Sequence, residues 1–296
     1  MSNEITEQTE SKDPRIEKAE AAVNEVVESA RPRRGTDIFH APWIDGVRVR
    51  SPCPQVVTLH DLVPLKRRSE YLRTGMRFRL RYMAVERAAR VIVPTEAVAS
   101  DAVDHLDLPR ERVVVIPEAA APAMRPMDPA TVATVRQRYA LPDEYLVWVG
   151  GLEHPDPRKR VQALAEAPRD MPLVLVGPAK QWAHELPDVT LTGQVPDDDL
   201  AAIYTGARAL VLASDDEGFG LPSVEALACG TPVVACDVPA LREVLADRAT
   251  FVGHDDLAGL LATAATASRP APDPPEWSWE DAARATWDVY AEAAAE

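Results

Sequence analysis

The stretch from Glu217 to Gly230, EGFGLPSVEALACG, carries the residues best suited to chemistry. Two carboxylates, Glu217 and Glu225, are separated by seven residues that include glycines, a phenylalanine and a proline. Pro222 suits the first turn of a helix, and Gly230 suits the position just after a helix end. The free N–H groups and the dipole at the start of such a helix favour a phosphate. The segment therefore predicts a loop that leads into a short helix and binds an anionic ligand.

Two interpretations of Glu225 compete. In the first, Gly218 and Gly220 let the backbone approach a ligand, and Glu225, expected in the first helical turn, accepts hydrogen bonds from sugar hydroxyls. In the second, Glu225 only balances the dipole of an ordinary helix N-terminus. The joint presence of the glycines, Pro222 and both carboxylates favours the first.

The segment 217–230 must be positioned by the predicted elements around it. Short apolar strands are expected to alternate with helices, such as those at 70–89 and 96–107. The predicted strands are 37–41, 55–60, 90–95 and 112–117 in the first half, and 145–151, 172–177, 189–193, 209–214 and 231–236 in the second. Uninterrupted β-branched strands are typical of parallel sheets covered on both faces. The pattern predicts an α/β protein with two doubly wound, Rossmann-like domains that bind ligands beyond the carboxyl ends of their strands.

The predicted domain organisation has five parts. They are a disordered tail (1–13), a helix and break (14–35), an acceptor-side domain (36–141), a donor-side domain (142–268), and a proline-rich linker with a C-terminal helix (269–296).

Charge and composition exclude several classes of function. The net charge of −15 argues against a general nucleic-acid or anionic-membrane binder, because such a protein needs a basic face. Arg77, Arg79 and Arg81 predict either a local peripheral membrane contact or, as the favoured alternative, a solvated helix face. Three cysteines without CxxC spacing, and no apolar run of membrane-spanning length, predict a cytoplasmic protein without a metal cage.

The segment 217–230 resembles the Glu-x7-Glu motif of the retaining GT-B glycosyltransferases of family four, which include bacterial mannosyltransferases. Other segments are similar to the same family, namely 231–245, 147–160, 56–64, 89–103 and 112–126. The resemblance runs from about Thr36 to the C-terminus.

The resemblance implies roles for the donor-side residues. Glu217 would lie beside the transferred sugar, and Glu225 would bind the donor ribose. Backbone N–H groups would face the sugar and diphosphate at Gly218, Phe219, Gly220 and Leu221. Gln194 and Val195 would form the loop that meets the nucleobase.

Lys159, with Arg158 beside it, would neutralise the leaving diphosphate, since a fixed cation there stabilises the transition state more than the ground state. The alternative for Lys159 is a solvated basic turn. His60 would contact the transferred sugar from the acceptor side; its alternative is a strand-end histidine bonded to local backbone. Asp61 is expected to act as a turn or helix cap, and His40 to be structural.

The resemblance implies no metal and no cofactor beyond the donor substrate. The run Asp197, Asp198 and Asp199 is better explained as the start of a helix than as a metal site. Asp215 and Asp216 lack DxD spacing.

The chain departs from the family pattern in three places. No strand with a glycine-rich turn precedes Thr36, so a truncated N-terminal domain is expected. Position 151 is Gly where relatives carry Arg, and position 118 is Glu where Asn is common.

Two hypotheses of function follow. The first is a retaining glycosyltransferase that moves a sugar from a nucleotide-diphosphate sugar, with GDP-mannose as first choice, to a hydroxyl of a glycan, lipid or small molecule. The second is a non-catalytic nucleotide-sugar-binding partner of another glycosyltransferase. The helix at 14–30 would then serve as a homo- or hetero-oligomer contact.

Overall fold

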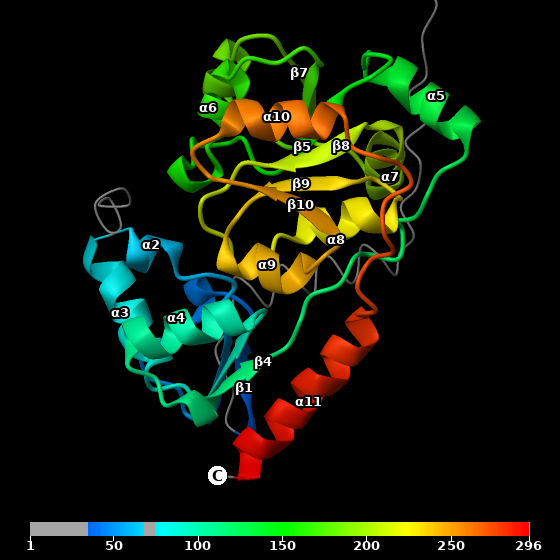
Figure 1. The fold of residues 1–296 in the computed structure, drawn as a ribbon. Helices are drawn as coiled ribbons and strands as arrows, with labels where there is room; N and C mark the ends of the chain where they lie inside the picture. The colour runs from blue at the N-terminus through cyan, green and yellow to red at the C-terminus, as the bar shows by residue number, and fades with distance from the viewer. Residues whose placement is uncertain (1–34, 68–74, 296) are drawn as a thin grey trace, which may run out of the picture.

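The computed structural model describes residues 35–67 and 75–295, with the side chains of 75–79 excepted. These residues form two α/β domains with parallel sheets (Figure 1). The predicted tail (1–13) and predicted helix (14–30) lie outside the described residues, as do the side chains of Arg77 and Arg79. Arg81 forms an ion pair with Asp45.

The first domain is built on a four-stranded sheet, in the described part of the chain, with the order β1-β2-β3-β4. Its elements are β1 (Phe39–Ala41), η1 (Ile44–Gly46), β2 (Gln55–Thr58), α2 (Val63–Lys66), α3 (Gly75–Val85), β3 (Arg90–Val93), α4 (Glu96–Leu106), η3 (Arg110–Arg112) and β4 (Val113–Val115).

Both faces of this sheet are covered. Successive strand residues point to opposite sides, and each set packs against its own layer. Val57 packs in the core that includes residues of α3 and α4. Its neighbour Val56 packs with Val289 of the C-terminal helix α11 (Trp279–Ala295). Figure 1 shows α11 running from the second domain back to the first. His40 is structural, as predicted, and bonds Tyr290 of α11 and Thr58 at 2.5 and 2.8 Å.

The second domain has a six-stranded sheet with the order β10-β9-β8-β5-β6-β7. Its elements are α5 (Pro129–Arg138), β5 (Leu146–Val149), η4 (Pro157–Lys159), α6 (Val161–Glu166), β6 (Leu173–Val176), η5 (Gln181–Glu185), β7 (Val189–Gly193), α7 (Asp197–Gly206), β8 (Ala209–Leu212), α8 (Leu221–Ala228), β9 (Val233–Cys236), α9 (Pro239–Leu245), β10 (Ala249–Val252) and α10 (Leu257–Ala265). Residues of α6 and α10 share the core on one face, and residues of α5, α7, α8 and α9 share the core on the other.

The predicted α/β architecture is confirmed, with three differences in detail. Helix α5 was assigned to the acceptor-side range 36–141, but its Val135 lies in the core of the donor-side sheet. Strand β10 was not predicted; it is an edge strand, and none of its four residues is fully buried. Helix α2 was also missed, since its four residues are too few to show a helical period.

The two domains meet where α9 approaches the N-terminus of α4 (Figure 1). The carboxylate of Glu243 on α9 accepts hydrogen bonds from the backbone N–H groups of Glu96 and Ala97, at 2.7 and 3.0 Å. These are N–H groups that have no partner inside their own helix. One domain therefore caps a helix of the other.

We expect Glu243→Gln to lower the free energy of unfolding by about 1 kcal/mol, because a helix cap of this kind contributes about that much. Chemical denaturation would measure the change. Glu185→Gln, at an exposed position of the same domain, is the matched control. Equal stability of the two variants would show that the cap contributes nothing.

Candidate active site

The loop that follows β8 touches the loop that follows β2, so the carboxyl ends of the two sheets face each other. A Cβ atom added to Gly218 would lie 1.8 Å from the backbone carbonyl oxygen of His60. Next to this contact, Thr95 Oγ1 donates a hydrogen bond of 2.9 Å to the carbonyl of Gly218. Glycine is required at 218 because any side chain would separate the domains.

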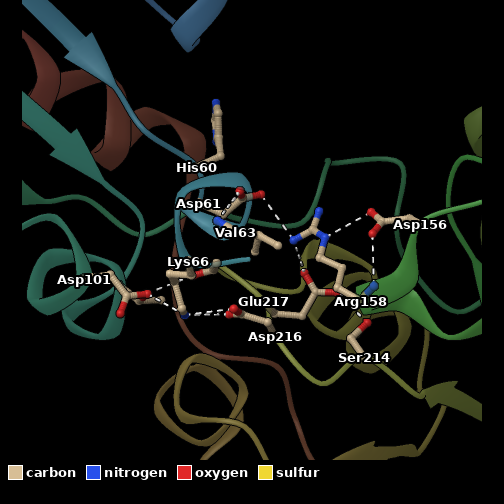
Figure 2. A network of polar contacts seen from close by, with 12 residues as sticks. His60, Asp61, Val63, Lys66, Asp101, Asp156, Arg158, Ser214, Asp216 and Glu217 are labelled. Atoms are coloured by element: carbon tan, nitrogen blue, oxygen red, sulfur yellow. Dashed lines mark hydrogen bonds and ion pairs between the residues drawn. The ribbon is translucent and has the colours of Figure 1, made fainter. Parts of the chain in front are cut away.

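Ion pairs hold the same two loops together (Figure 2). Lys66 of α2 reaches Asp101 at 2.8 Å in its own domain and Asp216 at 2.9 Å in the other. Arg67 pairs with Asp215 at 2.6 Å. The two acidic residues directly before Glu217 are thus anchored to the first domain.

Glu217 lies inside this network, and its side chain is 14% exposed. Ser214 donates a hydrogen bond of 2.7 Å to its carboxylate, and Arg158 approaches it at 3.5 Å. Burial raises the pKa of Glu217, whereas the charges of Arg158 and Lys159 and the bond from Ser214 oppose that rise. The carboxylate is held in place from the donor side.

Arg158 is shared among three carboxylates, with distances of 3.1 Å to Asp156, 3.2 Å to Asp61 and 3.5 Å to Glu217. Its buried Nη1 makes no hydrogen bond within the described residues, although both Asp61 and Glu217 are within ion-pair distance. Asp61 also accepts the N–H of Val63 at 3.1 Å, which agrees with the turn role predicted as one of its two alternatives; the N-cap of α2 is Leu62.

Lys159 differs from Arg158 although the two are neighbours in η4. Its ammonium lies 5.9 Å from the centre of the Trp148 ring. It has no carboxylate within ion-pair distance in the described ranges 35–67 and 75–295. Its charge still lowers the pKa of Glu217. Among the described residues, Lys159 is therefore a cation beside the site without an ion-pair partner.

Helix α8 begins as the sequence predicts, with Pro222 in its first turn and Gly220 as its N-cap. Gly220 has φ +82°, and a Cβ there would lie 2.4 Å from Leu241. Leu221 is the first helical residue. The side chain of Phe219 is buried and packs on Trp277, with ring centres 5.6 Å apart. Phe219 thus anchors the loop through its ring, and its backbone N–H is not needed for that packing.

Glu225 is not in the first turn of α8, where it was expected, because α8 starts at Leu221. One turn further on, it accepts a hydrogen bond of 3.0 Å from the hydroxyl of buried Tyr204. Burial raises the pKa of Glu225 to about 7; the bond from Tyr204 opposes the rise and the charges of Asp197 and Glu118 add to it. A buried carboxyl group with one protein donor retains capacity for another.

His60 lies on the acceptor side, with its side chain 52% exposed. Figure 2 shows its ring directed away from Asp61, Arg158 and Glu217. The ring nitrogens bond to Glu118 at 2.8 Å and to the carbonyl oxygen of Pro42 at 3.1 Å.

The remaining predicted site residues lie further away. Gln194 and Val195 follow β7, the edge strand three places from β8. Gln194 is exposed, and Val195 packs against the donor-side core. The run Asp197–Asp199 was predicted to start a helix rather than to bind a metal. The helix start is confirmed, since these residues begin α7, but Pro196 is the N-cap.

Sequence reasoning missed Lys66, Arg67, Tyr204 and the pairing roles of Asp215 and Asp216. For Asp215 and Asp216, the sequence signal is their position directly before Glu217. In the described part of the chain no three His, Cys, Asp or Glu side chains gather as metal ligands would. No described helix combines the length and apolar character needed to cross a membrane.

Solved structures with the GT-B fold share this arrangement of two domains. Sucrose-phosphate synthase from Thermosynechococcus elongatus matches with a TM-score of 0.66 and 22% identity over 95% of this chain and 80% of that one. HepE of Anabaena, in complex with UDP and glucose, matches with a TM-score of 0.62 and 20% identity over 93% and 76%. The chain has the GT-B fold.

Two family models match the sequence in succession. "Glycosyltransferase Family 4" matches residues 24–123, and "Glycosyl transferases group 1" matches residues 143–267. The chain belongs to this family of mannosyltransferase-like GT-B proteins.

Curated relatives are similar over part of their length. The serotype-specific mannosyltransferase WbdA of Escherichia coli is 30% identical over 231 residues, which is 69% of this chain and 28% of WbdA. The O-antigen chain mannosyltransferase B of Escherichia coli is 28% identical over 62% of this chain and 54% of that protein. This chain thus spans about a quarter to a half of these two relatives.

We expect Gly218→Ala to weaken the domain contact, because the new methyl group would meet backbone rather than a flexible side chain. Overpacking of this kind costs about 1–3 kcal/mol. Denaturant unfolding measures the loss. Gly151→Ala is the matched control, since a Cβ at Gly151 meets nothing within 4 Å. Equal effects of the two substitutions would contradict the steric role of Gly218.

We expect Glu225→Gln to stabilise the protein at pH 8 and to have little effect at pH 5. The folded-state pKa of about 7 exceeds the ordinary value of 4.5, so the folded state binds the proton more tightly and stability falls as pH rises between these values. The ionised group costs up to about 3 kcal/mol at pH 8. Thermal unfolding at both pH values tests this, with exposed Glu153→Gln as control. A pH-independent difference would contradict it.

Proposed function

We propose that the protein transfers a sugar from a nucleotide-diphosphate sugar to an acceptor hydroxyl with retention of configuration. The observation that carries the proposal is the position of Glu217, held by Arg158 and Ser214 between the uncompensated Lys159 and the domain contact at Gly218. Membership of the family and the mannosyltransferase relatives support the same reaction class.

In the proposed complex the diphosphate lies between the N-terminus of α8 and Lys159. The backbone from Gly218 to Leu221 offers N–H groups, and the helix dipole favours negative charge there. The diphosphate gains charge as the sugar leaves, so Lys159 and the buried N–H of Arg158 stabilise the transition state more than the bound donor. This scheme uses no divalent cation.

Glu225 would bind the donor ribose, and Glu217 the transferred sugar. The acceptor oxygen attacks the anomeric carbon on the face from which the phosphate departs. The carbon–oxygen bond to the phosphate breaks, and the acceptor proton passes to the leaving phosphate oxygen. Because Glu217 is engaged by Ser214 and Arg158, it serves as an anchor for the sugar rather than as a covalent nucleophile.

GDP-mannose is the proposed donor, in line with the relatives named as mannosyltransferases. UDP-glucose is the matched alternative, because the HepE structures contain UDP and glucose or UDP-glucose. A thermal-shift panel of GDP, UDP and both nucleotide sugars separates the two, since a ligand at 100 times its Kd stabilises the native state by about 2.7 kcal/mol. Absence of any shift would contradict nucleotide binding.

We expect Lys159→Ala to lower sugar transfer by a factor of about 10²–10³, as loss of a transition-state donor does elsewhere. The rate is measured as release of nucleoside diphosphate from the preferred donor, with water or a supplied alcohol as acceptor. We expect EDTA to leave this rate unchanged. Exposed Lys180→Ala is the control. Nucleotide binding without turnover in the unsubstituted protein would point to the non-catalytic partner, and full turnover in Lys159→Ala would refute the assigned site.

A further inference from the structure

The pairing of His60 with Glu118 fixes the protonation state of the histidine. His60 follows β2 and Glu118 follows β4, so the two side chains meet across the end of the intervening strand β3. Nδ1 of His60 lies 2.8 Å from Oε1 of Glu118, and Nε2 lies 3.1 Å from the carbonyl oxygen of Pro42. Both ring nitrogens therefore face oxygen acceptors.

The carbonyl oxygen of Pro42 can only accept, so Nε2 must carry a hydrogen. A carboxylate at Nδ1 also accepts, so Nδ1 must carry a second hydrogen unless Glu118 is itself protonated. Imidazole is a stronger base than a carboxylate. The shared proton thus stays on His60, and the pair is an imidazolium with a carboxylate.

We propose that Glu118 is a positioning residue that holds His60 as a doubly protonated imidazolium, so that His60 serves the reaction as a fixed positive charge and not as a base. This inference rests on the proposed transfer function. With both nitrogens protonated, His60 cannot accept the proton of the acceptor hydroxyl. That agrees with the leaving phosphate as the proton acceptor.

The charged surroundings of His60 favour the same state. The hydrogen bond that His60 donates to Glu118 raises the pKa of His60; burial opposes this, and the charge of Glu118, the carbonyl of Pro42 and the charge of Asp61 add to it. Nearby His40 is neutral at pH 7, because burial and the charge of His60 lower its pKa to about 4. The charge of Glu118 also raises the pKa of Glu225, so the pair lies within electrostatic reach of the candidate ribose ligand.

The pH dependence follows from the sign of the shift. Because the folded-state pKa of His60 is raised above 6.5, the imidazolium persists at neutral pH and is lost as pH rises through the raised value. The transfer rate per bound donor should therefore decline on the alkaline side. Replacing Glu118 with glutamine should move that decline to lower pH.

The decisive measurement is an NMR titration of the imidazole signals, with the His60 signal assigned by its loss in His60→Gln. Among the six histidines of the sequence, His60 should titrate above 6.5 in the unsubstituted protein and at or below 6.5 in Glu118→Gln. Glu118→Asp, which keeps the charge, should restore part of the difference. Exposed Glu111→Gln in the same domain is the control, with no change expected.

An unchanged His60 titration in Glu118→Gln, or a value at or below 6.5 in the unsubstituted protein, would overturn the proposal. Unchanged signals of the other histidines show that the variant folds. The pH profile of nucleoside diphosphate release should move in parallel, and a profile that stays in place while the His60 titration moves would separate the pair from catalysis. Absence of any turnover would remove the proposed function but leave the titration interpretable.

Discussion

The contact between Gly218 and the backbone of His60 is the constraint on which the rest of the site depends. It brings the loops that follow β2 and β8 to van der Waals distance, and the ion pairs between these loops need that distance. Lys66 and Arg67 reach Asp216 and Asp215 only because the two loops touch. Because Gly218 has no side chain, the donor-side loop and the acceptor-side loop can touch directly.

The contact between the loops also buries charged side chains, although burial of charge does not by itself favour stability. Arg158 offsets Glu217 in its own domain and Asp61 in the other domain. A buried pair of this kind is weak evidence for stability because desolvation opposes the attraction. Glu225 is a clearer case, since burial raises its pKa to about 7 and a single tyrosine opposes that rise by hydrogen bonding. Carboxyl groups with perturbed pKa values that lie close together are typical of binding and catalytic sites.

The sequence predicted what depends on local pattern and missed what depends on distant pairs. All nine proposed strands are present, eight of them in shorter form and β7 with the proposed bounds, because uninterrupted apolar runs are a strong signal. Pro222 and Gly230 bounded α8 correctly. Edge strand β10 was missed, since its residues are only partly buried. Lys66 and Asp216 are 150 positions apart, and no spacing rule connects residues at that separation. The start of α8 was predicted correctly, but Glu225 is its fifth residue and therefore lies in the second turn rather than the first.

The distribution of cations around Glu217 bears on how a strongly acidic chain could bind a diphosphate. With a net charge of −15, the field of the whole molecule repels such a ligand. Most positive groups near Glu217 are already matched: Lys66, Arg67 and Arg158 all face carboxylates. Within the described residues Lys159 is not, so in the proposed complex its charge and the N–H groups of α8 would supply the attraction. Such a site, with little excess charge, would hold the diphosphate weakly enough to release it after transfer.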